Sequence, residues 1–315
     1  MKNSALPMAI LVSDIHLSIN PPVARRDDDW LNAQAYQLSQ LRAASIKHKV
    51  PVICAGDLFH QWKSPPELIN FALEHLPDKM WAIPGQHDLP FHNYGEMDKS
   101  AFGTLVKVGK IRLLKPDSEN VIYPGKDKPL LSAFAFPWGH PLVENDLPTP
   151  KDELRLAVVH AYVWQQGSSY TNASPTQRIS ALAKQLKGYD VAVFGDNHKG
   201  FSAQVGDCLV FNHGGFMRRN IDEIDSQPGF GLLMSDGSVL RQHLDVSKDV
   251  FLPKEEARFL EQEGFKMTAF LDELKKLGSG ASDFESAVKH YLKTYEVSSG
   301  ATKLIIAALH HNESA

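Results

Sequence analysis

Five short apolar runs in this chain each end in a cluster of aspartate, histidine or amide side chains. Continuous apolar runs rich in β-branched residues are typical of strands buried inside a sheet. The runs and the polar residues that follow them are MAILV before Asp14 and His16, VPVICA before Asp57, MWAIP before Gln86, His87 and Asp88, LRLAVV before His160, and VAVF before Asp196 and His198. The intervening segments WLNAQAYQLSQLRAASIKHK and SPPELINFALEHL have helical patterning, so the sequence predicts an α/β fold.

The polar clusters lie where an α/β sheet gathers its ligands, just beyond the carboxyl ends of the strands. A single Asp-x-His or Gly-Asp after a strand is more often an ordinary turn. A single histidine there is more often a hydrogen-bonded structural residue. Ordinary turns give no reason for five such clusters to follow five separate runs, and we therefore predict that the clusters meet in one metal site.

The candidate ligands combine carboxylates with neutral imidazoles, a mixture that suits Mn, Fe, Zn or Co better than Mg. They are too many for one ion, whereas two ions about 3.5–4 Å apart that share a carboxylate would use them all. The candidates are Asp14, His16, Asp57, Gln86, His160, Asp196 and His198. Such a pair of ions activates water for attack on a phosphoester, which agrees with the lack of a convincing Ser or Cys nucleophile motif.

Composition indicates the cellular compartment but does not identify the substrate. The net charge of −4 and the pI near 6.4 neither support nor exclude a DNA substrate. Cys54 and Cys208 are too few for a disulfide framework or a thiolate metal site, as is typical of a reducing cytosol. No stretch approaches the roughly 18 apolar residues of a membrane span. We therefore expect a soluble, cytoplasmic protein without a membrane partner.

The motifs also have a known counterpart. In order, Asp14-x-His16, Gly56-Asp57, Gly85-x-His87-Asp88, His160 and Gly195-x-x-His198 resemble the motif set of the calcineurin-like metallophosphoesterases, over roughly residues 8 to 215. The resemblance implies a four-layer α-β-β-α sandwich and two divalent ions, with Mn²⁺ as the expected metal. We assign residues 1–250 to this domain and residues 251–315, which have helical patterning, to a C-terminal segment for partner docking.

The resemblance also implies a role for each residue. Asp14, His16 and His198 would hold the first metal, Asp57 would bridge, and Gln86, His160 and Asp196 would complete the second metal. His87 would lie against the substrate phosphate as general acid or transition-state stabiliser, with Asp88 holding its ring. His60 matches a position near the phosphate, although a capped turn before a helix explains it equally well.

Two positions depart from the family pattern, and both belong to the second metal. The family has Asn where this chain has Gln86, and His where it has Asp196. One interpretation is a working site with altered metal preference or affinity. The other is a site that binds one ion and catalyses poorly. His213 could substitute as a ligand, or it could hold backbone near the site.

Within the superfamily, the stretch GDLFHQWKSPPELINFALEHL looks most like the SbcD-type nucleases of DNA repair and recombination. That likeness implies a DNA exonuclease or endonuclease, an SbcC-type coiled-coil ATPase as partner, and a homodimer. Arg218 and Arg219 would then contact phosphates, unless they are ordinary surface arginines. Two alternatives stay open: a phosphatase or phosphodiesterase acting on a small molecule or nucleotide, and a DNA- or ATPase-binding subunit with little turnover.

Overall fold

A computed structural model describes residues 5–125, 128–146, 153–171 and 173–258 of the 315-residue chain. Its contacts divide the chain into two units, Met1–Phe251 and Leu252–Ala315. Most of the predicted C-terminal docking segment lies outside the described residues, so its helical character and its role stay predictions. The account that follows concerns the first unit.

One sheet of this unit is built on the first three predicted strands. It contains β1 (Pro7–Val12), β2 (Val52–Ala55), β3 (Met80–Ile83), β4 (Ile111–Leu113), β11 (Gly229–Met234) and β12 (Val239–His243), in the order β12-β11-β1-β2-β3-β4. Strands β1 to β4 are parallel, with Ile10 opposite Val52, whereas β11 and β12 add an antiparallel edge. The polar clusters after β1, β2 and β3 therefore leave the sheet at one edge.

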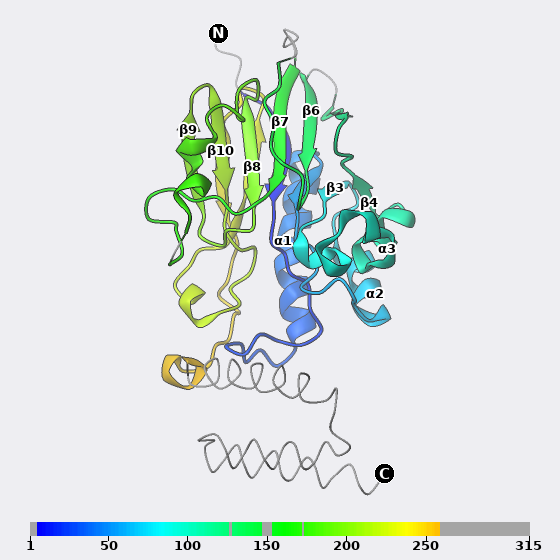
Figure 1. Ribbon diagram of the computed structural model, residues 1–315. Coiled ribbons are helices and arrows are strands. Elements are labelled where there is room, and N and C mark those ends of the chain that lie inside the picture. The colour runs from blue at the N-terminus through cyan, green and yellow to red at the C-terminus, as the bar shows by residue number, and fades with distance from the viewer. Residues whose placement is uncertain (1–4, 126–127, 147–152, 172, 259–315) are drawn as a thin grey trace, which may run out of the picture. The chain divides into compact units, whose positions relative to one another are not determined.

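The other two predicted strands belong to a second sheet (Figure 1). It contains β5 (Glu119–Ile122), β6 (Leu130–Phe136), β7 (Glu153–His160), β8 (Val191–Gly195), β9 (Phe201–Val205) and β10 (Cys208–Asn212), in the order β5-β6-β7-β8-β10-β9. Strands β6, β7, β8 and β10 are parallel, and β5 and β9 pair antiparallel at the two edges. The register places His160 opposite Gly195, so the clusters after β7 and β8 also lie side by side.

The outer face of the first sheet is covered by the helices α1 (Trp30–His48), α2 (Pro66–His75) and α3 (Ala101–Lys107). Helix α1 begins where the Asp29 side chain accepts a hydrogen bond from Asn32 N, an N-cap that satisfies a free N–H of the first turn. Proline occupies the first position of α2, where its missing N–H costs nothing. Both predicted helices are confirmed within a few residues.

The layers follow from the alternation of side chains along the strands. In β1, Ile10 and Val12 pack with the helices, whereas Ala9 and Leu11 belong to the cluster between the two sheets. On the far face of the second sheet, η5 (Ile179–Leu182) and the chain after it cover a third cluster. The predicted α-β-β-α sandwich is confirmed, with an outer layer of 3₁₀ turns on that face in the described part of the chain. No helix among the described residues is long and apolar enough to cross a membrane.

Candidate metal centre

The five predicted clusters meet where β1, β2, β3, β7 and β8 end. Four of their residues have left-handed backbone: φ is 51° at Asp14, 51° at His16, 53° at Asp57 and 78° at Asp196. Residues other than glycine adopt this conformation at a cost, which Asp, Asn and His tolerate best. The turns point these side chains back into the site, and their strain is of the kind that collects at functional sites.

Backbone hydrogen bonds hold the first two clusters together beyond their strands. Asp14 N donates to Gly56 O at 3.0 Å, and His16 N donates to Asp57 O at 3.0 Å. Space is equally restricted, because a Cβ on Gly56 would lie 2.2 Å from Nδ1 of His160. The glycine before Asp57 is therefore needed for the two sheets to approach each other at the site.

Asp14, His16 and His198 form one group of potential ligands, whose ligand atoms lie within 4.8 Å of one another. Asp14 Oδ1 is 4.0 Å from His16 Nε2 and 3.8 Å from His198 Nε2. The two imidazole Nε2 atoms are 3.2 Å apart. These are the three residues predicted to hold the first metal, and the fold brings them together from two strand ends, those of β1 and β8.

Glu223 orients this group, and the sequence analysis missed it. Its Oε1 accepts a hydrogen bond from Nδ1 of His198 at 3.3 Å, which leaves Nε2 of the ring free for a metal. Burial lowers the pKa of His198, but Glu223 and Asp14 raise it to about 9. The other carboxylate oxygen of Glu223 accepts from Arg219 N and Asn220 N. The sequence signal, Asn220-x-x-Glu223, indicates only a capped turn.

A second group combines Asp14, Asp57 and His160. His160 Nδ1 donates to Ala55 O at 2.6 Å, so in the neutral ring Nε2 carries a lone pair. That atom faces Gln86 Oε1 at 2.6 Å and Asp57 Oδ2 at 3.4 Å, and both of these are acceptors. Burial lowers the pKa of His160, but Asp57 raises it to about 10. In the metal-free protein Nε2 therefore holds a proton that these oxygens accept, and a metal ion would take the place of that proton.

Asp57, a member of the second group, also faces His16 of the first, as a bridging ligand must. Its Oδ2 is 3.7 Å from Nε2 of His16 and 3.4 Å from Nε2 of His160. Burial raises the pKa of Asp57, but the surrounding histidines lower it to a net value below the usual range. The carboxylate is therefore ionised and available to two ions, so the donor set fits the pair of divalent metals that the sequence implies.

The two departures from the family pattern contact each other. Gln86 Nε2 donates to Asp196 Oδ1 at 2.7 Å, while Oε1 of the same amide faces His160. Asp196 N donates to both carboxylate oxygens of Asp14, at 3.0 and 3.2 Å. Asp196 belongs to neither of the ligand groups described above. It lies one hydrogen bond behind Gln86, and its role as a direct ligand stays a proposal.

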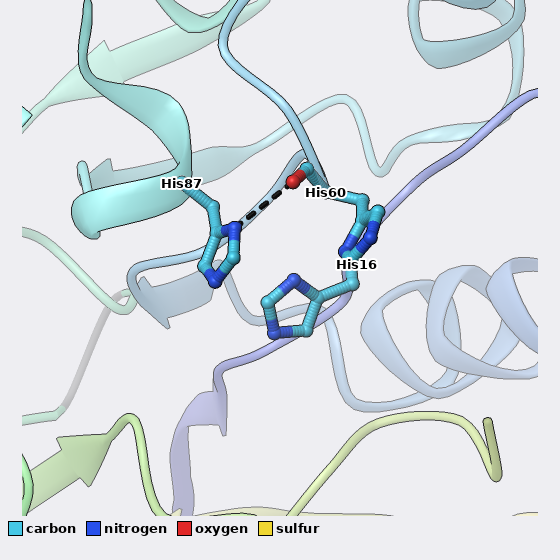
Figure 2. A group of neighbouring side chains, drawn as sticks. All are labelled: His16, His60 and His87. Carbon is cyan, nitrogen blue, oxygen red and sulfur yellow. Dashed lines mark hydrogen bonds between the residues drawn. The ribbon is translucent and has the colours of Figure 1, made fainter. Parts of the chain in front are cut away.

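His87 and His60 stand beside the ligands (Figure 2). His87 Nδ1 donates to His60 O at 2.9 Å, and the two rings stack with centroids 5.5 Å apart. His87 N also donates to Asp57 Oδ1 at 2.9 Å. Burial and the charge of Arg219 lower the pKa of His60 to about 4, so its ring is neutral at pH 7. His87 is thus tied to the bridging carboxylate while its Nε2 atom stays free of these bonds.

Asp88 was expected to hold the ring of His87, and this detail is wrong. Its carboxylate accepts from the backbone N–H groups of Leu58, Phe59 and Gly85, at 3.1, 2.9 and 3.0 Å. The ring is held by the His60 carbonyl instead. Asp88 is fully buried, and its part is to join the loop after β2 to the loop after β3.

His213 holds backbone near the site, which was one of its two expected roles. Its Nε2 accepts from Ser13 N at 2.6 Å, one residue before Asp14. Burial lowers the pKa of His213 to about 3, so the ring is neutral. With Nε2 engaged in this bond, the ring positions the chain after β1.

The structure does not bring Arg218 and Arg219 to the site as phosphate-binding groups. Arg218 donates to Asp249 and to the carbonyls of Ile224 and Val246. Arg219 is buried and donates to His16 O at 2.8 Å. Adjacent arginines in the sequence suggested an anion site, whereas both guanidinium groups are used to fix loops.

Comparison with known proteins gives a family match and distant structural matches. The family model for the calcineurin-like phosphoesterase superfamily domain matches residues 8–233. An archaeal phosphodiesterase is 13% identical, with 75% of this chain and 99% of that chain covered and a TM-score of 0.37. The protein TT1561 of Thermus thermophilus is 10% identical, with 76% and 99% covered and a TM-score of 0.44. A putative 5′-nucleotidase from Staphylococcus aureus is 12% identical, with 82% and 58% covered and a TM-score of 0.44. No curated protein sequence matches the chain.

Proposed function

Because the chain belongs to the calcineurin-like phosphoesterase superfamily, we propose that it hydrolyses phosphodiester bonds with the help of two divalent metal ions. The observation that carries this proposal is the convergence of potential ligand atoms on one point. His160 Nε2 lies 2.6 Å from Gln86 Oε1 and 3.4 Å from Asp57 Oδ2, and a metal ion would replace the proton that the raised pKa of His160 places between them. Asp57 also faces the first group, through His16.

The metals, when bound, would activate a water molecule and neutralise charge on the phosphate. The protein groups supply orientation and a proton. His87 is fixed through Nδ1 by the His60 carbonyl, so its Nε2 is the atom that meets the substrate. We assign it the transfer of a proton to the leaving oxygen, or the stabilisation of charge there. His60 supports it as a neutral stacked ring.

DNA is the first substrate we propose, in an SbcD-type nuclease of repair or recombination with an SbcC-type ATPase partner and a homodimeric state. Its support is the resemblance of the segment that starts at Gly56. In the structure this segment runs from the end of β2, past His60, into α2. The part of the segment that carries the resemblance therefore includes a residue stacked on His87.

A small phosphodiester is the second candidate, and a specific observation favours it. Arg218 and Arg219, the nearest basic pair in the sequence, are both engaged internally. A long DNA backbone is normally held by Lys and Arg contacts to several phosphates. A small ester needs only the centre itself.

Cleavage assays with Mn²⁺-loaded protein separate these candidates. Linear double-stranded and single-stranded DNA are compared with bis(4-nitrophenyl) phosphate, and His87→Ala is the matched inactive variant. Cleavage of DNA that is lost in His87→Ala supports the nuclease. Turnover of the small ester with intact DNA overturns it. Metal binding without any turnover favours a binding subunit, and repeating the assay with Fe²⁺, Zn²⁺ and Co²⁺ identifies the preferred metal.

A further inference from the structure

A strained aromatic turn follows His87 directly. Phe91 and His92 have left-handed backbone, with φ of 52° and 58°. The Phe91 side chain is 83% exposed. Left-handed backbone is uncommon in residues other than glycine, and for a bulky aromatic side chain it is a genuine outlier. The strain does not bury the ring, so packing does not account for it.

Hydrogen bonds fix this turn to the metal centre. His92 Nδ1 donates to Gln86 O at 3.2 Å, and His92 N donates to Leu89 O at 3.1 Å. Asn93 N donates to Pro90 O at 3.0 Å. The Phe91 ring is therefore presented from a turn whose base includes a predicted ligand of the second metal.

Further aromatic rings lie on both sides of the turn. Trp62, two residues after His60, is tilted against Phe91 with ring centroids 5.9 Å apart. Trp138 is 6.3 Å from the His92 ring and 6.4 Å from the His160 ring. The aromatic rings thus continue from the His60 side of the centre to the His160 side, and Phe91 is more exposed than either tryptophan.

We propose that Phe91, supported by Trp62, stacks on a nucleobase of the substrate whose phosphate lies against His87. This inference rests on the proposed phosphodiesterase function and names the substrate as a nucleotide ester. Aromatic side chains bind bases of any identity because every base has a π-face, and they need no positive charge. That matches a site whose nearest arginines are engaged elsewhere.

Calorimetric titration of the Mn²⁺-loaded protein with AMP and with ribose 5-phosphate, which lacks the base, tests the proposal. AMP should bind about 5- to 150-fold more tightly, the factor that base stacking of about 1–3 kcal/mol gives. Phe91→Asn should reduce this ratio to near one, because asparagine tolerates left-handed backbone but has no ring. Phe91→Tyr, which keeps an aromatic ring, should keep the wild-type ratio.

Tyr123→Ala is the matched control, since Tyr123 is also an exposed aromatic residue, at 78%. It follows β5, which runs antiparallel to β6 and so ends at the sheet edge away from His160. This variant should keep the wild-type ratio. A ratio near one in the wild type, or a ratio that survives in Phe91→Asn, overturns the proposal.

The binding assay does not depend on turnover, so the two proposals can fail separately. Base-dependent binding without cleavage of any phosphodiester would overturn the hydrolase and keep the stacking site. Cleavage of a phosphodiester without base-dependent binding would keep the hydrolase and overturn the stacking site. Titration with a thymidine tetranucleotide then distinguishes the source of the base. A further Phe91-dependent gain over AMP indicates a DNA strand, and no gain indicates a nucleotide.

Discussion

The two halves of the metal centre are built from the same kind of strand ends but differ in how ready they are for a metal. In the first half, Glu223 fixes His198 with its Nε2 atom facing His16 and Asp14. In the second half, Gln86 donates to Asp196 and faces His160. Ligand chemistry alone does not distinguish the two halves, because the hydrogen bonds behind the ligands also determine how their donor atoms are oriented. We expect the second ion to bind more weakly than the first.

The largest effect should come from Asp57, whose carboxylate faces histidines of both halves. Asp57→Asn removes the charge that faces His16 and His160, and hydrolysis should fall by about 10³-fold or more. Both metal-binding events should weaken together, as measured by metal analysis after dialysis. Asp207→Asn, at an exposed turn, is the control. Loss of only one ion would mean that Asp57 does not bridge.

Glu223→Gln should act on the first half alone. Removing the charge behind His198 weakens the orientation of its ring, and metal affinity at the first site should fall by about 10- to 100-fold. Calorimetric titration with Mn²⁺ measures the change. Asp222→Asn, the exposed neighbouring carboxylate, should have no such effect. An equal loss at both sites would contradict the separation of the two halves.

Asp196→His tests the second half, because it restores the residue that the resemblance implies. The Gln86 amide loses its carboxylate acceptor, and a new imidazole becomes available to the second ion. We expect the affinity of the weaker ion to change by about 10-fold, with the tighter ion unaffected. Metal content and activity that both stay unchanged would show that Asp196 is not a ligand of the second ion.

The smallest effect is the coupling between Gln86 and Asp196 in the metal-free protein. A hydrogen bond to a charged group contributes about 1.5–3 kcal/mol at most, and partial exposure of both side chains reduces this. A double-mutant cycle with Gln86→Ala and Asp196→Ala should give a coupling of about 1 kcal/mol in urea unfolding with EDTA. A coupling of zero would mean that the hydrogen bond between Gln86 and Asp196 does not stabilise the metal-free protein.

Most of the fold could be predicted from local patterns in the sequence. Each ligand cluster follows its own strand within a few residues, so Asp14, Asp57 and His160 could be found one run at a time. Two of the contacts that were missed or misplaced join residues far apart in the sequence. Glu223 reaches His198 from a separate turn, and Arg219 binds the carbonyl of His16. Sequence spacing contains no information about such pairs, which depend on how the two sheets meet.

The left-handed turns at Asp14, His16, Asp57 and Asp196 limit which sequences can make this centre. Asp and His each bind metals and each tolerate left-handed backbone, so either residue meets the demand of the ligand chemistry and the demand of the turn at once. A library that randomises these positions should therefore return far fewer active variants than ligand chemistry alone allows. Glutamate would offer a carboxylate but lacks the tolerance of aspartate for the turn. The backbone, as much as the metal, restricts which residues can evolve at these positions.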